Sequence, residues 1–289
     1  MGVIEATVNR RSVMADVRLD GKVALVTGAG SPIGMGRVIA LAMLRAGAKV
    51  AMLDIKDDWL QQTANEAREI AGDAAVSTLV ADTSRWDEAQ RVVQSTVDTH
   101  GSLDVLVNLA GVHHRSLLPP SDRPLHFWEQ PVDVWERMIA VNSTGPFLMA
   151  RAAVPGMIER GWGRVIGVTT SLDTMTRNIP YGPSKATHEA MVAAMAPELE
   201  GTGVTTNALL PGGGTNTMFV DRDPSRDFSA LVQPEVMGPP AVWLASEESD
   251  GFNGMRVIAN DWDPALGVEE NLQRSSAPAA WRQLARGAG

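Results

Sequence analysis

The sequence lacks cysteine altogether and contains a single tyrosine, Tyr181, among its 289 residues. Without cysteine, the protein can form no disulfide, no thiol nucleophile and no cysteine-ligated metal site. Its chemistry must therefore come from oxygen groups, nitrogen groups and a cofactor. Long hydrophobic runs are also missing, because every apolar stretch falls far short of the roughly 20 residues that span a bilayer. No basic amphipathic helix is evident either, so we expect no association with a membrane.

The sequence contains fewer basic than acidic residues. Lys and Arg number 25 against 34 Asp and Glu, which sets the formal net charge at -9 and the sequence pI near 5.1. Such a surface repels the phosphate backbone, so nucleic acid is not an expected partner. The first twenty residues contain arginines but no apolar segment of the kind that a secretory signal needs. These features predict a cytoplasmic protein with a flexible N-terminal arm at 1–19.

Apolar residues are abundant, at 44% of the chain, which suffices for a large packed core. Short β-rich runs alternate with longer segments of helical periodicity; the runs lie at 23–28, 49–55, 76–82, 103–111, 164–170, 204–212 and 255–261. Near-continuous Val, Ile, Leu and Ala in these runs is typical of strands buried on both faces. The sequence predicts an α/β fold with a single doubly wound Rossmann-type domain over 20–262. Its seven-stranded, mostly parallel sheet carries helices on both faces, and 263–289 form an irregular C-terminal extension.

The turn after the first expected strand, TGAGSPIGMGR at 27–37, is rich in glycine. In doubly wound folds this turn usually receives the phosphates of a dinucleotide, because glycine lets backbone N–H groups come close to them. The glycines here are Gly28, Gly30, Gly34 and Gly36. Ile33 stands where the strict pattern has its third glycine, and the loop is longer by two residues. A turn of this composition also occurs in ordinary strand-to-helix connections, so alone it is weak evidence.

Asp54 ends the second expected strand, twenty residues after Gly34. A carboxylate at this point can accept hydrogen bonds from both hydroxyls of an adenosine ribose, whereas it repels a 2′-phosphate. This favours NAD over NADP as the cofactor. Two alternatives stay open: Asp54 is only a solvated acid at a strand end, or the neighbouring Lys56 and Arg37 offset its repulsion and admit NADP.

The motifs, taken in order, resemble the classical short-chain dehydrogenases/reductases (SDR family) over about residues 20–262. They are TG…GMG within 27–36, Asp82 after the third run, NLAG at 108–111, Asn142 in AVN, Ser171 after the fifth run, YGPSK at 181–185 and PGGGTNT at 211–217. The resemblance implies that Tyr181 donates and accepts the proton, that Lys185 assists it, that Ser171 orients the substrate and that Asn142 belongs to a proton relay.

The resemblance also implies a cofactor site along the carboxyl edge of the sheet. Its members are Gly28, Gly30, Ser31, Ile33, Gly34, Met35, Asp54, Asp82, Thr83, Asn108, Ala110, Gly111, Tyr181, Lys185, Pro211, Gly212, Gly214, Thr215 and Thr217. Two departures from the family pattern accompany the lengthened glycine loop. Leu109 replaces a usual second asparagine, and Ser171 precedes Tyr181 by only ten residues. Because of the short interval, Thr170 is an alternative for the serine role.

The chemistry explains why Tyr181 should stand four residues before Lys185. Hydride transfer belongs to the cofactor, so the protein must orient the carbon and manage one proton. A phenol has an unperturbed pKa of about 10, and a nearby ammonium lowers that pKa by favouring phenolate. Residues four apart lie on one face of a helix. We therefore expect Lys185 to lower the pKa of Tyr181.

The long connection between Gly111 and Asn142 and the segment after PGGGTNT offer side chains for a substrate pocket. His113 and Phe219 are the expected substrate contacts, and they favour a medium-sized alcohol or ketone, aromatic or cyclic compounds included. Adjacent His113 and His114 lack a third ligand at regular spacing, so no metal site is predicted.

Three functions fit these residues. The first is an NAD(H)-dependent oxidoreductase that interconverts a secondary alcohol and a ketone. The second is an NADP(H)-dependent carbonyl reductase, and the third is a non-catalytic dinucleotide-binding sensor or scaffold. A sensor needs none of the four catalytic candidates, which argues against the third. The resemblance also implies a homo-oligomer, a tetramer or dimer, built through the helices that carry Asn142 and Tyr181.

Overall fold

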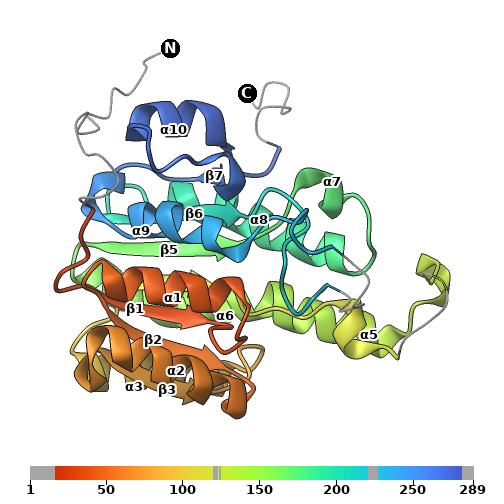
Figure 1. Cartoon of the computed structure of the whole chain (residues 1–289), viewed down its shortest axis with the longest axis horizontal. Coiled ribbons are helices and arrows are strands. Elements are labelled where there is room, and N and C mark those ends of the chain that lie inside the picture. The colour runs from red at the N-terminus through yellow and green to blue at the C-terminus, as the bar shows by residue number, and fades with distance from the viewer. Residues whose placement is uncertain (1–16, 120–122, 124, 221–226, 282–289) are drawn as a thin grey trace.

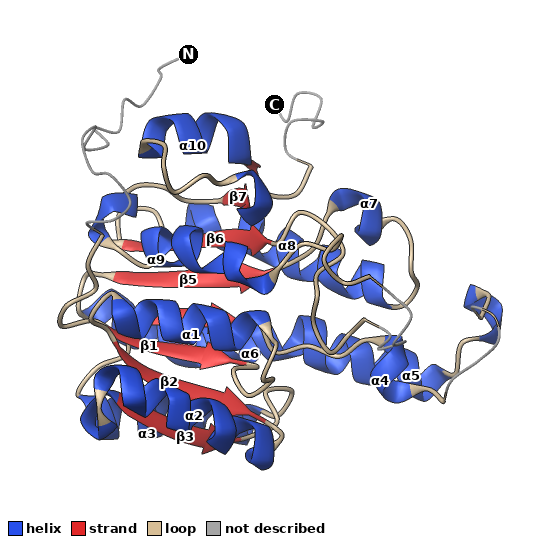
Figure 2. Ribbon diagram, viewed as in Figure 1, coloured by secondary structure: helices blue, strands red, loops and turns tan. Residues whose placement is uncertain are grey.

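The computed structural model describes residues 17–119, 123, 125–220 and 227–281. One sheet with the strand order β3-β2-β1-β4-β5-β6-β7-β8 runs through the molecule, with helices on both of its faces (Figures 1 and 2). The strands are β1 (Val23–Thr27), β2 (Lys49–Asp54), β3 (Val76–Val80), β4 (Val105–Asn108), β5 (Gly163–Val168), β6 (Val204–Leu210), β7 (Met255–Ile258) and β8 (Ser276–Pro278). Strands β1 to β7 match the predicted runs, with β5 beginning one residue early at Gly163, and pair in parallel, so the Rossmann-like fold is confirmed.

The helices divide between the two faces of the sheet. Helices α1, α2 and α9 cover the face toward the viewer in Figure 2, and α3, α6 and α8 cover the opposite face. The helices are α1 (Met35–Arg45), α2 (Asp57–Ala71), α3 (Trp86–His100), α4 (His114–Leu117), α5 (Val132–Ile139), α6 (Gly145–Glu159), α7 (Leu172–Met175), α8 (Tyr181–Glu198), α9 (Gly238–Leu244) and α10 (Val268–Ser275). A π-helical turn at Ala140–Thr144 joins α5 to α6.

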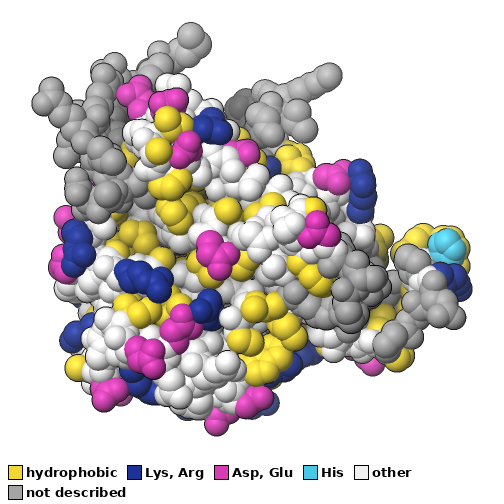
Figure 3. Space-filling view, in the orientation of Figure 1, with side chains coloured by type: hydrophobic (Ala, Val, Ile, Leu, Met, Phe, Trp, Pro, Cys, Tyr) yellow, Lys and Arg dark blue, Asp and Glu magenta, His cyan; other side chains and the backbone are white. Residues whose placement is uncertain are grey.

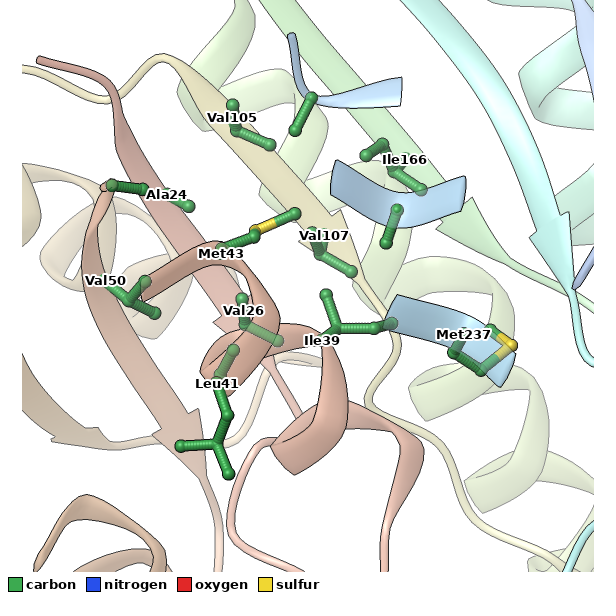
Figure 4. Packing of buried hydrophobic residues seen from close by; sticks show 14 of the residues in the cluster. Ala24, Val26, Ile39, Leu41, Met43, Val50, Val105, Val107, Ile166 and Met237 are labelled. Carbon is green, nitrogen blue, oxygen red and sulfur yellow. The ribbon is translucent and has the colours of Figure 1, made fainter. Parts of the chain in front are cut away.

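The core between the sheet and α1 shows why this helix forms where it does. Ile39 and Met43 are four residues apart, lie on one face of α1 and are fully buried. They point toward Val26 of β1 and Val107 of β4 (Figure 4). Burying each side chain of this size contributes about 1.5–3 kcal/mol relative to exposure. This packing holds α1 across β1 and β4 and so positions the turn before it.

The strand order reverses at β1, which has β2 on one side and β4 on the other. The chain runs outward from β1 to β3 and then returns to β4. In open α/β sheets, ligands bind outside the carboxyl ends of the strands at such a switch point. The fold therefore places the glycine turn after β1 beside the NLAG motif after β4.

The C-terminal part differs from the expected irregular extension, and the sheet has eight strands rather than seven. Helix α10 and strand β8 both lie beyond residue 262, and β8 pairs antiparallel with β7. The pattern missed α10 because its sequence, VEENLQRS, is mostly polar. It missed β8 because three residues ending in proline carry no period-2 signal.

The expected N-terminal arm lies outside the described residues as far as residue 16. Its last three residues, however, belong to the folded body. Val17 and Leu19 are buried in the main core, with 7% and 1% of their surface exposed. The Leu19 N–H donates a hydrogen bond to the Ala46 carbonyl at 2.8 Å, which attaches this segment to the end of α1.

The surface carries charges of both signs. On the face shown in Figure 3, Lys and Arg side chains are interspersed with Asp and Glu rather than gathered into one basic patch. Within the part of the chain that the structure describes, no helix has the length and apolar character needed to cross a membrane. Residues 125–131, just before α5, extend away from the body (Figure 1), and Phe127 and Trp128 among them are 64% and 68% exposed.

Candidate active site

The glycine turn after β1 forms a tight cradle at the start of α1. A Cβ atom on Gly36 would lie 2.2 Å from the carbonyl oxygen of Gly28, so only glycine fits there. Gly34 is the N-cap of α1, no side chain caps this helix, and its first turn contains no acidic residue. Uncapped N–H groups and the positive end of the helix dipole favour an anion at this point.

Two further features of the lengthened loop fit a bound phosphate group. The Ser31 hydroxyl oxygen is buried and has no hydrogen-bond partner within the part of the chain that the structure describes. Among the described residues, the backbone N–H groups of Ser31, Ile33 and Met35 also make no hydrogen bond. Buried polar groups are rarely left unpaired without a reason. The turn therefore presents unused donors where a dinucleotide phosphate would be held.

Asp54 lies at the carboxyl end of β2 and faces this loop. One carboxylate oxygen accepts the Gly30 N–H at 2.9 Å, and the other accepts the Lys56 N–H at 3.1 Å. Each oxygen has a second lone pair, so two hydroxyl donors can still be accommodated. The Thr63 hydroxyl fixes the loop from the other side by donating to the Gly30 carbonyl at 2.9 Å.

Arg37 and Lys56, the two cations considered above as offsetting the charge of Asp54, have other partners. Arg37 donates two hydrogen bonds to Glu66, at 2.8 and 2.5 Å. The Lys56 ammonium lies 3.7 Å from the ring centroid of Trp59, a cation–π contact. Neither side chain forms an ion pair with Asp54, so the negative charge at the end of β2 is not neutralised by them.

Thr27 connects the ends of β1 and β4 at the switch point through hydrogen bonds. The sequence predicts no role for this residue. Its hydroxyl donates to the Val107 carbonyl at 3.1 Å and accepts the N–H groups of Leu109 and Ala110, each at 3.0 Å. One side chain thus ties the end of β1 to the NLAG segment. The only signal in the sequence was its position just before Gly28. Because threonine is common in strands generally, that position does not distinguish this role.

Thr83 and Asn108 lie near the amino end of α6, and the side chains of Asp82 and Asn108 are already engaged in hydrogen bonds. Asn108 donates to the Pro146 carbonyl at 3.1 Å, and the Thr83 hydroxyl lies against Gly145. Burial alone would raise the pKa of Asp82, but hydrogen bonds from Ser84 and Arg137 outweigh it and lower that pKa. These side chains hold the loop after β3 and helix α6 in place. An adenine ring would therefore contact only those parts of their surfaces that these interactions leave accessible.

Asn142 lies in the π-helical turn and is completely buried. Its amide oxygen accepts the Val112 N–H at 2.8 Å, and its amide nitrogen donates to the Val112 carbonyl at 2.9 Å. The same nitrogen donates to the Ser184 hydroxyl at 3.0 Å, which in turn donates to the Tyr181 carbonyl at 2.7 Å. Asn142 therefore joins the loop after NLAG to the first turn of α8. Ser184 is a second residue that the sequence did not single out.

Tyr181 and Lys185 open helix α8 on one face, as their spacing predicts. The glycine between them is required, because a Cβ on Gly182 would lie 2.1 Å from the Arg177 carbonyl oxygen. Lys185 is only 4% exposed, and its ammonium donates to the Val168 carbonyl at the end of β5, at 2.9 Å. Tyr181 is half-buried at the rim of the same site.

The prediction that the pKa of Tyr181 is lowered is wrong for the protein without its cofactor. Burial raises the pKa of Tyr181 to about 12 and lowers the pKa of Lys185 to about 8. Both shifts have the same cause, because a buried group disfavours its charged form. The Lys185 ammonium is directed to the Val168 carbonyl. The protein alone therefore does not produce the lowered phenol pKa that the sequence predicts.

Ser171 and Thr170 follow β5 directly and both remain possible partners for Tyr181. The Ser171 hydroxyl caps α7 by accepting the Thr174 N–H at 3.2 Å, and it lies 2.9 Å from the Thr174 hydroxyl. Its proton is free for a substrate only when Thr174 is the donor of that pair. Thr170 is half-buried, and its carbonyl accepts a hydrogen bond from Arg256 at 3.3 Å.

His113 lies beside Tyr181 and also contacts Phe219. The His113 ring is edge-on to the phenol, with centroids 4.9 Å apart, and stacks with Phe219 at 5.9 Å. Thr217 supports Phe219 by accepting its N–H at 3.4 Å. The two substrate candidates thus contact each other although they come from different loops, and His113 connects Phe219 to the phenol. The described residues contain no group of three or more side chains suited to hold a metal ion.

Backbone hydrogen bonds to other segments hold the PGGGTNT segment after β6 in place. Pro211 accepts the Asn260 N–H at 3.1 Å, and Gly214 accepts the Val232 N–H at 3.0 Å. Thr215 bridges to Val232, and both Thr215 and Thr217 are buried. Gly212 has a φ of 96°. This segment brings the hydroxyl of Thr217 to the site edge that carries Phe219.

Comparison with known proteins agrees with this geometry. A family model described as short chain dehydrogenase matches residues 22–226. The chain is 31% identical over 257 residues to 2,5-dichloro-2,5-cyclohexadiene-1,4-diol dehydrogenase LinX of Sphingobium indicum, covering 85% of this chain and 97% of that protein. It is 32% identical over 270 residues to NADPH-dependent aldehyde reductase 2, chloroplastic, of Arabidopsis thaliana, covering 84% and 93%.

A solved structure is similar over the same extent. The short-chain type dehydrogenase/reductase from Mycobacterium marinum superposes with a TM-score of 0.73 at 28% sequence identity, covering 86% of this chain and 97% of that one. The similarity thus extends across the sheet and both helical layers rather than over one motif.

Proposed function

Because the chain belongs to the short-chain dehydrogenase family, we propose that it is an NAD(H)-dependent oxidoreductase that interconverts a secondary alcohol and a ketone, with Tyr181 as general acid and base. Members of this family are oxidoreductases that act on alcohol and ketone substrates. The observation that carries the finer proposal is the start of α8. There a half-buried phenol lies one turn before a buried ammonium and beside the aromatic ring of His113.

The chain's own residues would handle orientation and the proton. A bound nicotinamide dinucleotide supplies or accepts the hydride. Tyr181 donates its proton to a ketone oxygen or accepts one from an alcohol. Lys185 keeps a positive charge near the phenol and is held in place by the Val168 carbonyl. Ser171 or Thr170 donates a hydrogen bond to the substrate oxygen and stabilises the charge that gathers there.

The choice of NAD rests on the charges around Asp54. Its carboxylate retains acceptor capacity, and the two neighbouring cations are engaged by Glu66 and Trp59. A 2′-phosphate would thus meet a carboxylate without a compensating arginine, which is unfavourable. The alternative is NADP(H)-dependent carbonyl reduction, and one observation favours it: a relative that is 32% identical carries NADPH dependence in its name.

Titration with NADH and with NADPH, followed by nicotinamide fluorescence, tests the cofactor assignment. We expect NADH to bind about tenfold more tightly, a difference of about 1.4 kcal/mol. Asp54→Asn should narrow that ratio, because it keeps the side-chain volume and one acceptor oxygen but removes the charge. Asp57→Asn, at the exposed start of α2, is the matched control and should leave the ratio unchanged. Tighter binding of NADPH by the unaltered protein would reject the assignment.

A screen of secondary alcohols with NAD and of ketones with NADH, read at the nicotinamide absorbance, tests turnover. Tyr181→Phe keeps the ring that packs against His113 and removes only the hydroxyl. General acid–base catalysis contributes about 10²- to 10⁴-fold, so we expect a loss of that size in kcat with an unchanged Kd for NADH. Comparable turnover by the variant would refute the role given to Tyr181.

We also propose that the protein forms a homo-oligomer through α5, the π-helical turn and α6. Val132, Trp135 and Phe147 expose 70%, 42% and 46% of their surface along these helices. Covering such apolar surface in a second copy would stabilise the assembly. Light scattering after size-exclusion chromatography should give a mass of two or four chains, and Trp135→Glu should reduce it. A single-chain mass for the unaltered protein would exclude the assembly.

A further inference from the structure

A buried ion pair lies behind the candidate active site and has no part in the proposed proton transfer. Glu189 is on α8, two turns after Tyr181, and is completely buried; Arg256 is on β7 and is 7% exposed. Arg256 Nε and Glu189 Oε1 are 3.2 Å apart. Removing two charges from water is costly, and a well-packed apolar pair is often at least as stable. This pair therefore calls for an explanation beyond stability.

Both members of the pair contact the short segment that leads from β5 to Ser171. Arg256 Nη2 donates to the Thr170 carbonyl at 3.3 Å. Glu189 Oε2 accepts a hydrogen bond from the Thr169 hydroxyl at 2.9 Å. These are the two residues immediately before Ser171, so the pair connects the segment of the substrate-orienting hydroxyl to the helix of Tyr181.

The C-terminal strand completes this connection. Strand β8 pairs with β7 in a register that sets Ala277 opposite Arg256. Just beyond β8, the Ala280 N–H donates to Glu189 Oε1 at 3.1 Å, and Ala279 is completely buried. Glu189 Oε1 thus faces both the guanidinium and a backbone donor from the C-terminal segment.

We propose that Glu189 and Arg256 are positioning residues that set the Thr170–Ser171 turn against helix α8. The C-terminal segment of β8 and Ala280 holds the pair in place. The inference rests on the proposed function, because the turn matters for catalysis only if one of its hydroxyls orients the substrate. An arginine fork can reach the glutamate and the Thr170 carbonyl together, whereas a lysine offers one point charge. An error of about 1 Å in such a turn can reduce turnover about 10²-fold.

The variants Arg256→Met, Arg256→Lys, Glu189→Gln and Thr169→Val test this inference. Arg164→Met is a matched control, because Arg164 is a 1% exposed arginine of strand β5 that pairs with Asp250 and donates hydrogen bonds to Ser246 and Ser249 instead. We expect Arg256→Met to lower kcat about 10- to 100-fold with the Kd for NADH within twofold of the unaltered protein. Arg256→Lys should have a higher kcat than Arg256→Met. The Arg164→Met variant, measured at a temperature at which it is folded, should have the kcat of the unaltered protein.

Hydrogen–deuterium exchange provides a readout that does not depend on turnover. Arg256→Met and Thr169→Val should speed exchange in the peptide over 169–176, whereas Arg164→Met should speed it around 246–250 and not in 169–176. If the unaltered protein turns over no alcohol or ketone, the proposed function fails and exchange alone decides the positioning role. Folded Arg256→Lys or Thr169→Val variants with unchanged exchange in 169–176 would overturn the inference. A folded Arg256→Met variant with kcat within twofold of the unaltered protein would also overturn it.

Discussion

The imidazole ring of His113 lies edge-on to the phenol ring of Tyr181, with 4.9 Å between their centroids and 65° between their planes. The two residues come from different halves of the chain, one after β4 and the other at the start of α8. Phe219 stacks on the same imidazole at 5.9 Å. The rings of His113 and Phe219, from two different segments, thus form an aromatic wall next to the only phenol of the protein.

We predict that this wall selects the substrate. Phe219→Ala should raise KM for cyclic or aromatic alcohols about tenfold, because losing about 1.4 kcal/mol of apolar contact corresponds to that factor. Short-chain alcohols should be affected less. His113→Ala should act in the same direction, and neither change should alter the Kd for NADH. Steady-state kinetics over an alcohol size series provides the measurement.

His126→Ala is the control for these variants. His126 is exposed and stacks on Trp128 at 4.5 Å, in the segment that extends from the body. The substitution should leave KM unchanged for every alcohol. Equal changes in KM for small and large substrates in Phe219→Ala would contradict a role in size selection.

The partner of Tyr181 can be identified by comparing Ser171→Ala with Thr170→Val. Removing one donor to a charge that develops in the transition state costs about 10²- to 10³-fold in kcat. We expect this loss in one of the two variants only, and Ser171→Ala is the first choice. Loss of the α7 cap by Ser171→Ala should also cost about 1 kcal/mol of stability. Thr174→Val is the control, since it removes the partner hydroxyl but keeps the Ser171 hydroxyl and the cap bond from the Thr174 N–H, so it should retain kcat. A large kcat loss in neither variant would exclude both hydroxyls.

Asn142 should matter for folding as well as for the site. Asn142→Ala would leave the half-buried N–H and carbonyl of Val112 without their Asn142 partners, and each unsatisfied buried group costs about 1–3 kcal/mol. We expect the free energy of unfolding to fall by about 2–4 kcal/mol in urea titrations. Ser143→Ala removes one hydrogen bond, to the Ser184 carbonyl, and should cost about 1 kcal/mol. Equal losses in the two variants would argue against the connecting role of Asn142.

The lowered pKa of Lys185 predicts a specific dependence of the free energy of unfolding on pH. Burial lowers its pKa from 10.5 to about 8 in the folded protein, so between these values the unfolded chain binds more protons than the native one. Stability contributed by this group therefore rises with pH across that window. Integrating between pH 8 and pH 10 gives about 2 kcal/mol. Urea titrations of the cofactor-free protein at several pH values measure it.

Lys185→Met keeps most of the side-chain volume and removes the titrating group. The free energy of unfolding of the unaltered protein minus that of Lys185→Met should rise by the stated amount between pH 8 and pH 10. The window ends at pH 10 because burial raises the pKa of Tyr181 to about 12, and that shift makes stability fall at higher pH. A difference that stays flat would show that Lys185 keeps an ordinary pKa.

The local patterns of the sequence predict most of the fold and the outline of the site. Seven parallel strands follow from apolar runs, since burial on both faces leaves a signal within a few residues. The shared face of Tyr181 and Lys185 follows from helix periodicity. The pairing of Arg37 with Glu66, the role of Thr27 and the placement of β8 carry no such signal, because each depends on segments that are distant in the chain.

The sequence by itself determined that the chain is a doubly wound α/β protein, with a glycine turn before α1, an acid at the end of β2 and a phenol four residues before a lysine. These features depend on periodicity and spacing, which are local. Only the tertiary structure decided which groups they meet. It engages Asn108 with α6 and directs Lys185 to Val168. It also buries Tyr181 enough to raise its pKa, since hydrogen bonding and desolvation depend on neighbours that folding brings together.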